Sequence, residues 1–130
     1  MADGDTEIRI RVQHEAAIKD LCTVFDKHVR SLNKVARKTQ VYLSSDSIDI
    51  TTAQGFSQQY ESVVENISEV FERIVDLSLG SPPEKLEADF KSIDCESSKF
   101  LSDVRDQIQK FRSREELVIL RSKNEFQLIN

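Results

Sequence analysis

Two histidines, His14 and His28, are the side chains of this sequence best suited to bind a transition metal. On one helix they would lie well over two turns apart, whereas a pair of histidine ligands on a helix needs i, i+4 spacing. A metal site bridged by carboxylates in a helical bundle would need Glu-x-x-His motifs, and neither histidine completes one. His28 also falls on an apolar seam, where a histidine is more often a core or boundary residue. We therefore predict that the chain has no metal site.

Two cysteines, Cys22 and Cys95, are the thiols available for nucleophilic or redox chemistry. They lie far apart and form no Cys-x-x-Cys motif, and a catalytic cysteine would need a histidine beside it. Cys22 lies next to an apolar seam, which is typical of a buried, unreactive thiol. We expect both thiols to be reduced, as in a cytosolic or nuclear protein, and a disulfide between them is the alternative.

The sequence also has none of the short motifs that bind phosphates or activate a serine. It contains no Gly-x-Ser-x-Gly elbow, no P-loop and no dinucleotide-binding glycine pattern. Its three glycines lie at positions 4, 55 and 80, too far apart to build a phosphate-binding loop. We predict that the chain is not an enzyme, has no catalytic residues and uses no cofactor.

The composition indicates long amphipathic helices around one modest core. Of the 130 residues, 38% are hydrophobic and 32% are charged, and only three Gly and two Pro interrupt the chain. The net charge of −5 argues against direct binding to nucleic acid, because phosphates would be repelled on average. No apolar run approaches the ~20 residues of a membrane span, and no signal-type segment follows Met1. We expect an intracellular protein, cytoplasmic or nuclear, that is neither secreted nor membrane-spanning.

Three segments repeat apolar residues at alternating spacings of three and four, the pattern of helices that pack side by side. They cover residues 18–42, residues 53–77, which are the most regular, and residues 86–111, with a four-plus-four step at Ser97. We predict an all-α fold, an antiparallel three-helix bundle or coiled-coil hairpin with an extended third helix.

Turn and cap residues separate these segments. A stretch rich in Ser and Asp precedes the second helix, and Thr51 with Gln54 resembles a capping box that would begin it. Gly80 suits the left-handed position at the end of that helix. The residues that follow match the N-cap, first and third positions of the next helix, namely Ser81, Pro82 and Glu84. These residues predict a tight turn, with the second and third helices as antiparallel neighbours.

The N-terminal residues carry a different pattern. Residues 7–12 alternate apolar and charged side chains with period two, which favours a strand, although six residues are too few for a stable strand without a partner. The alternative is that they form the first turns of the first helix. We divide the chain into an extended segment at 1–13, a helical bundle at 14–112 and a C-terminal helical extension at 113–130.

Each of the first two helices displays one sign of charge along one side. The basic residues of the first helix are Lys27, Arg30, Lys34, Arg37 and Lys38, and the acidic residues of the second are Glu61, Glu65, Glu69, Glu72 and Asp76. We expect these stripes to flank each other within the hairpin and to select its pairing, at only ~0.2–1 kcal/mol per exposed pair. The alternative is that the basic stripe binds an acidic protein, lipid headgroups or nucleic acid.

The third helix should overrun the other two. The overrun carries four consecutive apolar residues, Leu117 to Leu120, which cover every side of a helix turn. A monomer that exposed them would be prone to aggregate, so we expect a partner to cover them. The alternative is that the third helix ends near Arg112 and the tail folds back.

These patterns predict a non-catalytic subunit that binds proteins through coiled-coil helix packing, as a structural, adaptor or scaffold component of a multi-subunit complex. The expected partners are amphipathic helices of other proteins or of a second copy, with no small-molecule substrate. The predicted interface has two parts. The apolar part is formed by Leu117, Val118, Ile119, Leu120 and Phe126. The polar docking site is formed by Lys34, Arg37 and Lys38.

The predicted architecture is similar to that of small helical subunits of transcription coactivator, kinetochore and vesicle-tethering complexes. This similarity implies a role in assembly, but architecture alone does not define function. Two alternative functions follow. One is a peripheral membrane or trafficking adaptor that uses the basic and apolar C-terminal helix. The other is a subunit of a nuclear transcription or chromosome complex that contacts nucleic acid indirectly.

Overall fold

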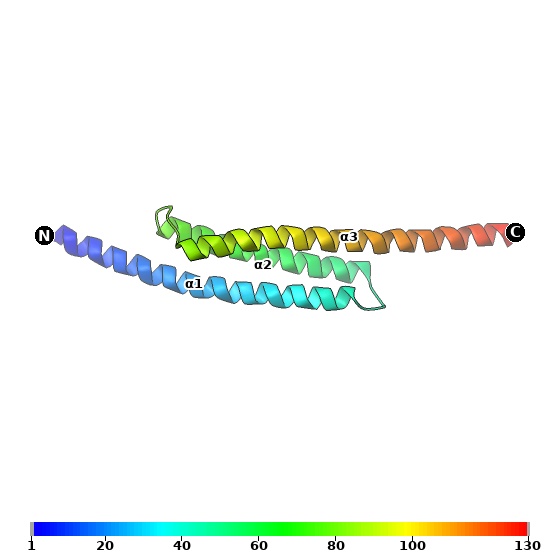
Figure 1. Ribbon diagram of the computed structural model, residues 1–130, viewed down its shortest axis with the longest axis horizontal. Coiled ribbons are helices and arrows are strands. Elements are labelled where there is room, and N and C mark those ends of the chain that lie inside the picture. The colour runs from blue at the N-terminus through cyan, green and yellow to red at the C-terminus, as the bar shows by residue number, and fades with distance from the viewer. Residues whose placement is uncertain (1, 130) are drawn as a thin grey trace.

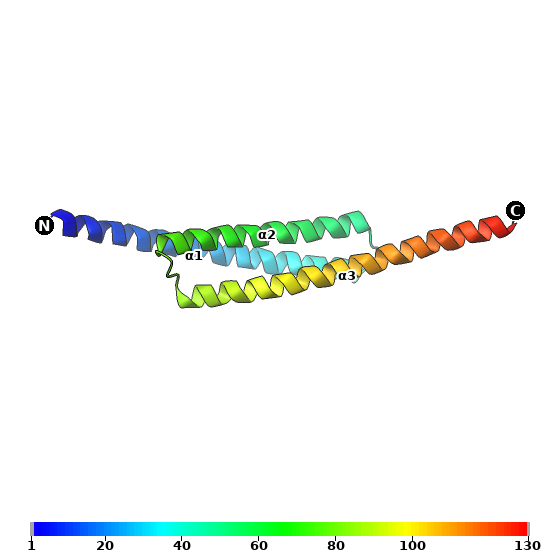
Figure 2. The same ribbon diagram turned by 90° about the horizontal axis from the view of Figure 1, so that it is seen from above.

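The computed structural model describes the backbone of residues 2–129 and the side chains of residues 8–121. Within that range it consists of three helices, α1 (Ala2–Leu43), α2 (Ile50–Leu77) and α3 (Glu84–Ile129), without a strand. α2 returns antiparallel to α1, and α3 runs in the direction of α1 again (Figure 1). Seen from above, α3 is inclined to the other two helices (Figure 2). The predicted all-α, antiparallel three-helix bundle with an extended third helix is confirmed.

The core forms where α2 packs against both of its neighbours. The largest cluster of buried side chains joins all three helices and consists of Phe25, Leu32 and Val35 of α1, Tyr60, Ile67, Val70 and Ile74 of α2, and Leu86 of α3. A second cluster lies nearer the α1–α2 turn and consists of Ala53, Val104 and Ile108. All of these residues lie on the predicted seams, and burying an aliphatic or aromatic side chain stabilises the fold by roughly 1.5–3 kcal/mol.

α1 and α3 are both longer than α2, and their extra turns project from opposite ends of the bundle (Figure 1). α1 has 42 residues and α3 has 46, whereas α2 has 28. At 1.5 Å per residue these helices are about 63, 69 and 42 Å long. We call residues 2–13 the α1 overhang and residues 113–129 the α3 overhang.

The predicted extended segment at 1–13 is wrong for the described backbone, because α1 begins at Ala2. A strand at residues 7–12 would need a neighbouring strand to satisfy its backbone groups, and the described part of the chain offers none. A helix satisfies those groups within the segment itself. The alternation of Ile8, Ile10 and Val12 therefore distributes apolar side chains around a helix instead of along one face of a sheet.

α2 begins slightly earlier than predicted. Its N-cap is Asp49, whose Oδ2 accepts hydrogen bonds from the Thr52 backbone N at 3.3 Å and the Thr52 hydroxyl at 2.8 Å. The predicted capping box at Thr51 is wrong, because a carboxylate caps the helix and also complements the positive end of its dipole. The Asp49 backbone N–H in turn donates to the Tyr42 hydroxyl at 2.7 Å, which ties the turn to the end of α1.

α3 begins at Glu84, two residues later than predicted. The carbonyl of Pro83 accepts the hydrogen bond of the Glu87 N–H at 3.0 Å, so Pro83 is the capping residue in place of Ser81. The reason is steric, because a proline disfavours helical backbone at the residue before it, here Pro82. Gly80 does adopt the predicted left-handed conformation, with φ of 84°, and its N–H donates to the Val75 carbonyl at 2.9 Å.

Candidate interaction surfaces

The α3 overhang exposes the four apolar residues on which the predicted interface depends. Leu117, Val118, Ile119 and Leu120 have exposed fractions of 56%, 63%, 55% and 55%. The helix continues through them instead of folding back. The side chain of the fifth predicted residue, Phe126, lies outside the described residues.

These four side chains point to two different sides of the helix. Val118 and Ile119 continue the side that faces the core and line a groove of about 350 Å³ together with Phe111 and with Ile48 of the α1–α2 turn. At about 100° per residue, Leu117 and Leu120 lie on the opposite side of the helix. An overhang that is apolar on both sides can contact helices on both sides.

The α1 overhang forms a second exposed apolar surface at the other end of the molecule. Ile8, Ile10 and Val12 are 61%, 47% and 58% exposed. Ile10 lies on the core-facing side, in a groove that Leu77 and Leu79 also line, whereas Ile8 and Val12 face away. This surface was not predicted from the sequence, because the alternation of residues 7–12 favours a strand. The three apolar residues were the signal that could have indicated it.

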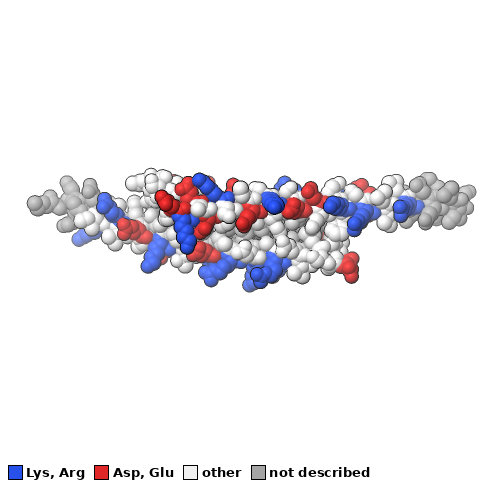
Figure 3. All heavy atoms as spheres, in the orientation of Figure 1, with Lys and Arg blue, Asp and Glu red and all other residues white. Residues whose placement is uncertain are grey.

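The basic stripe of α1 is exposed and faces away from the core. Lys34, Arg37 and Lys38, the predicted polar docking site, are all exposed. With Lys27 and Arg30 they fall within an arc of about 100° on the side of the helix opposite the buried residues of α1. Basic side chains accordingly gather along the α1 edge of the molecule (Figure 3).

The expectation that this stripe pairs with the acidic stripe of α2 is wrong. Among the described side chains, 8–121, no ion pair joins α1 to α2. The five acidic residues of α2 also lie opposite the core of their own helix, so the two stripes point outward in different directions. Pairing of α1 with α2 therefore depends on apolar packing. Among the described stripe residues, Glu61 pairs with Arg105 of α3, and the others remain available to other molecules.

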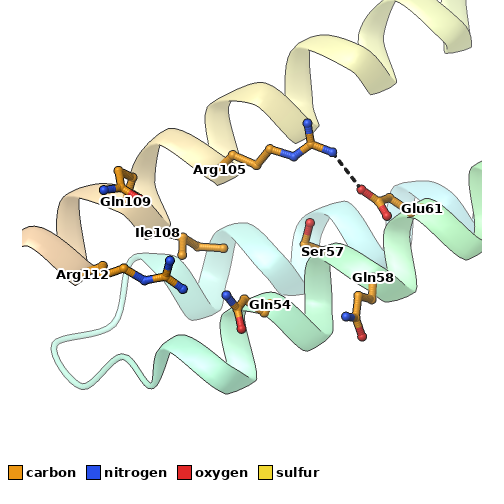
Figure 4. A pocket seen from close by; sticks show the side chains of 8 residues that line it. All are labelled: Gln54, Ser57, Gln58, Glu61, Arg105, Ile108, Gln109 and Arg112. Carbon is orange, nitrogen blue, oxygen red and sulfur yellow. Dashed lines mark hydrogen bonds and ion pairs between the residues drawn. The ribbon is translucent and has the colours of Figure 1, made fainter.

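A groove lined mainly by polar side chains lies between α2 and α3 (Figure 4). It has a volume of about 480 Å³, and Arg105 and Arg112 reach into it from α3 toward α2 (Figure 4). The Arg105 guanidinium pairs with the Glu61 carboxylate at 3.1 Å. This pair is solvent-exposed, so it contributes at most about 1 kcal/mol and serves to set the register of α3 on α2.

The two cysteines do not form a disulfide, and one of them is partly buried. Burial, reinforced by the negative charge of Asp26, raises the pKa of the Cys22 thiol and so disfavours its reactive thiolate form. Cys22 and Cys95 are both free thiols, and Cys95 is exposed. Within the part of the chain whose side chains are described, no cluster of His, Cys, Asp and Glu has the geometry of a metal site.

Comparisons with family models, with curated proteins and with solved structures find no match to this chain. Within the described residues, no helix combines the length and apolar character that crossing a membrane requires.

Proposed function

We propose that this protein is a non-catalytic interaction subunit that assembles with amphipathic helices through its α3 overhang. The observation that carries the proposal is the exposure, by more than half, of all four residues from Leu117 to Leu120 on a helix that extends past its own bundle. Exposed apolar side chains that are grouped in this way mark a protein contact. Covering each of these half-exposed side chains would stabilise a complex by roughly 1 kcal/mol, before the cost of association.

Two further observations support this proposal. The overhang is apolar on both sides, which suits insertion between helices of a larger bundle. The basic stripe of α1 is unpaired with α2 and faces outward, so Lys34, Arg37 and Lys38 are available as a second, polar docking site for an acidic partner. We place this role inside the cell, in the cytoplasm or nucleus.

The test is affinity purification of the full chain from cells, followed by mass spectrometry, with a Leu117→Asp/Leu120→Asp variant for comparison. The control is Val24→Asp/Val41→Asp, which changes two apolar residues of α1 beside the bundle that are 39% and 69% exposed. We expect the overhang variant to lose its partners while the wild type and the control keep them. All three should show the same helical circular dichroism, because none of the four positions is buried. Equal recovery of partners by the two variants would contradict the proposal.

A further inference from the structure

The two overhangs are related in a way that suits a second copy of the chain. α1 and α3 run in the same direction, and their overhangs project from opposite ends of the bundle (Figure 1). A copy rotated by half a turn and placed alongside would bring its α1 overhang next to the α3 overhang of the first copy, with the helices antiparallel. By symmetry the same contact would form at the other end.

We propose that the chain forms a two-fold symmetric homodimer in which the α1 overhang of each copy packs antiparallel against the α3 overhang of the other. This proposal rests on the proposed function, because it names the helix that covers the α3 overhang.

The charges of the two overhangs are complementary in this antiparallel arrangement. Along α3, basic residues at 112 and 114 are followed by acidic residues at 115 and 116 and by a basic residue at 121. Along α1 in the reverse direction, the acidic Glu15 is followed by the basic Arg11 and Arg9. Among the described side chains, two successive blocks of α1 therefore lie near blocks of opposite sign on α3 of the other copy, which favours this partner and this direction of packing.

The apolar residues fall in register with this pairing. When Glu15 lies level with position 113, between Arg112 and Arg114, residues 8–11 lie level with residues 120–117. Arg11 then lies within two residues of both Glu115 and Glu116. Each overhang would then bury one side of the apolar surface that the other leaves open, with charged residues around it. This combination of an apolar centre and a charged rim is characteristic of protein interfaces.

A closed dimer also covers both overhangs of both copies at once. A head-to-tail arrangement of the same surfaces would leave one α1 overhang and one α3 overhang uncovered at its ends and would continue to grow. The two arrangements differ in measurable mass, because the dimer stops at two copies at any concentration.

The test is a charge-exchange experiment read by sedimentation velocity. One variant carries Arg9→Glu/Arg11→Glu and the other carries Glu115→Arg/Glu116→Arg. Each variant alone would place like charges together at both contacts, so we expect its dimerisation to weaken by at least about tenfold. In an equimolar mixture, the acidic α1 overhang of the first variant meets the basic α3 overhang of the second. At the other contact, the α1 overhang of the second variant and the α3 overhang of the first both keep their wild-type charges. The mixture should therefore form a heterodimer.

The control variant Lys27→Glu/Arg30→Glu also reverses two exposed basic residues of α1, but on its outward-facing side beside the bundle and outside the proposed polar docking site. It should dimerise as the wild type does. A mixture that stays monomeric, variants that dimerise normally, or wild-type species that grow beyond two copies would each overturn the proposal.

A second experiment distinguishes failure of the homodimer from failure of the proposed function. A photo-crosslinker is introduced at Leu117 of the full chain in cells, and the crosslinked proteins are identified. A wild-type chain that is monomeric at every concentration but is crosslinked there to another protein would refute the homodimer and leave the interaction role intact. A monomer with no crosslinked protein would refute both.

Discussion

At the scale of single residues, one buried hydrogen bond explains a polar residue on an apolar seam. Ser97 occupies the four-plus-four step of α3 and is only 3% exposed. The Tyr60 hydroxyl of α2 donates to its Oγ at 3.2 Å, which satisfies both groups inside the core. The Tyr60 ring also lies against Phe100, with 4.4 Å between ring centroids. Ser97 is therefore part of the contact that joins α2 to α3.

This contact predicts how stability depends on alkaline pH. Burial raises the pKa of Tyr60 above its usual value of about 10, and the charge of Glu96 adds to the increase. The Ser97 hydroxyl, which can donate a hydrogen bond to the ionised Tyr60 oxygen, acts in the opposite direction. The unfolded chain therefore loses this proton at a lower pH than the folded chain. The stabilising contribution is complete below about pH 10 and is lost as the pH rises toward the folded-state pKa.

We expect the melting temperature of the wild type to fall above about pH 10 and that of Tyr60→Phe to fall less steeply, because the variant has no hydroxyl to ionise at this position. Thermal unfolding followed by circular dichroism at a series of alkaline pH values measures both slopes. Identical slopes would show that Tyr60 titrates alike in the folded and unfolded chain.

At the scale of elements, the α2–α3 turn depends on backbone conformation. Leu79 and Gly80 both have positive φ, 56° and 84°. A Cβ added at Gly80 would meet no atom within 4 Å, and the same holds for Gly55 inside α2. The two glycines therefore isolate the effect of backbone conformation from that of packing.

We predict opposite effects for the same substitution at these glycines. Gly80→Ala should lower the free energy of unfolding by about 1 kcal/mol, because alanine is strained in the left-handed region. Gly55→Ala should raise it by up to about 1 kcal/mol, because alanine favours the helix. Urea denaturation of the two variants compares them directly, and a change of the same sign in both would contradict this account of the turn.

The helices themselves could be predicted because their apolar periodicity is long and regular. Phe25, Ile67 and Ile74 lie on predicted seams and are at most 1% exposed. The ends of the helices were harder to predict, because several neighbouring residues are suited to the same N-cap position. Asp49 caps α2 in preference to Thr51, and the proline at 83 delays α3 in a way that single-residue cap preferences do not reveal.

At the scale of the whole molecule, the sequence predicted one of the two overhangs. The run Leu117–Leu120 indicated an exposed end of the third helix, and the structure exposes all four residues. The α1 overhang was missed, because a six-residue alternation carries too little information to distinguish a strand from a helix end. The outward direction of the two charge stripes became clear only when the core sides of α1 and α2 were known.

The central claim is that both overhangs are open surfaces of the isolated chain and not parts of its folded core. Hydrogen–deuterium exchange of the chain, diluted until its sedimentation shows a monomer, tests this claim most directly. We predict that the amides of residues 8–13 and 113–121 exchange much faster than those of residues 60–74, because tertiary packing protects the bundle but not the overhangs. Equal protection of the overhangs and the bundle in the monomer would contradict it.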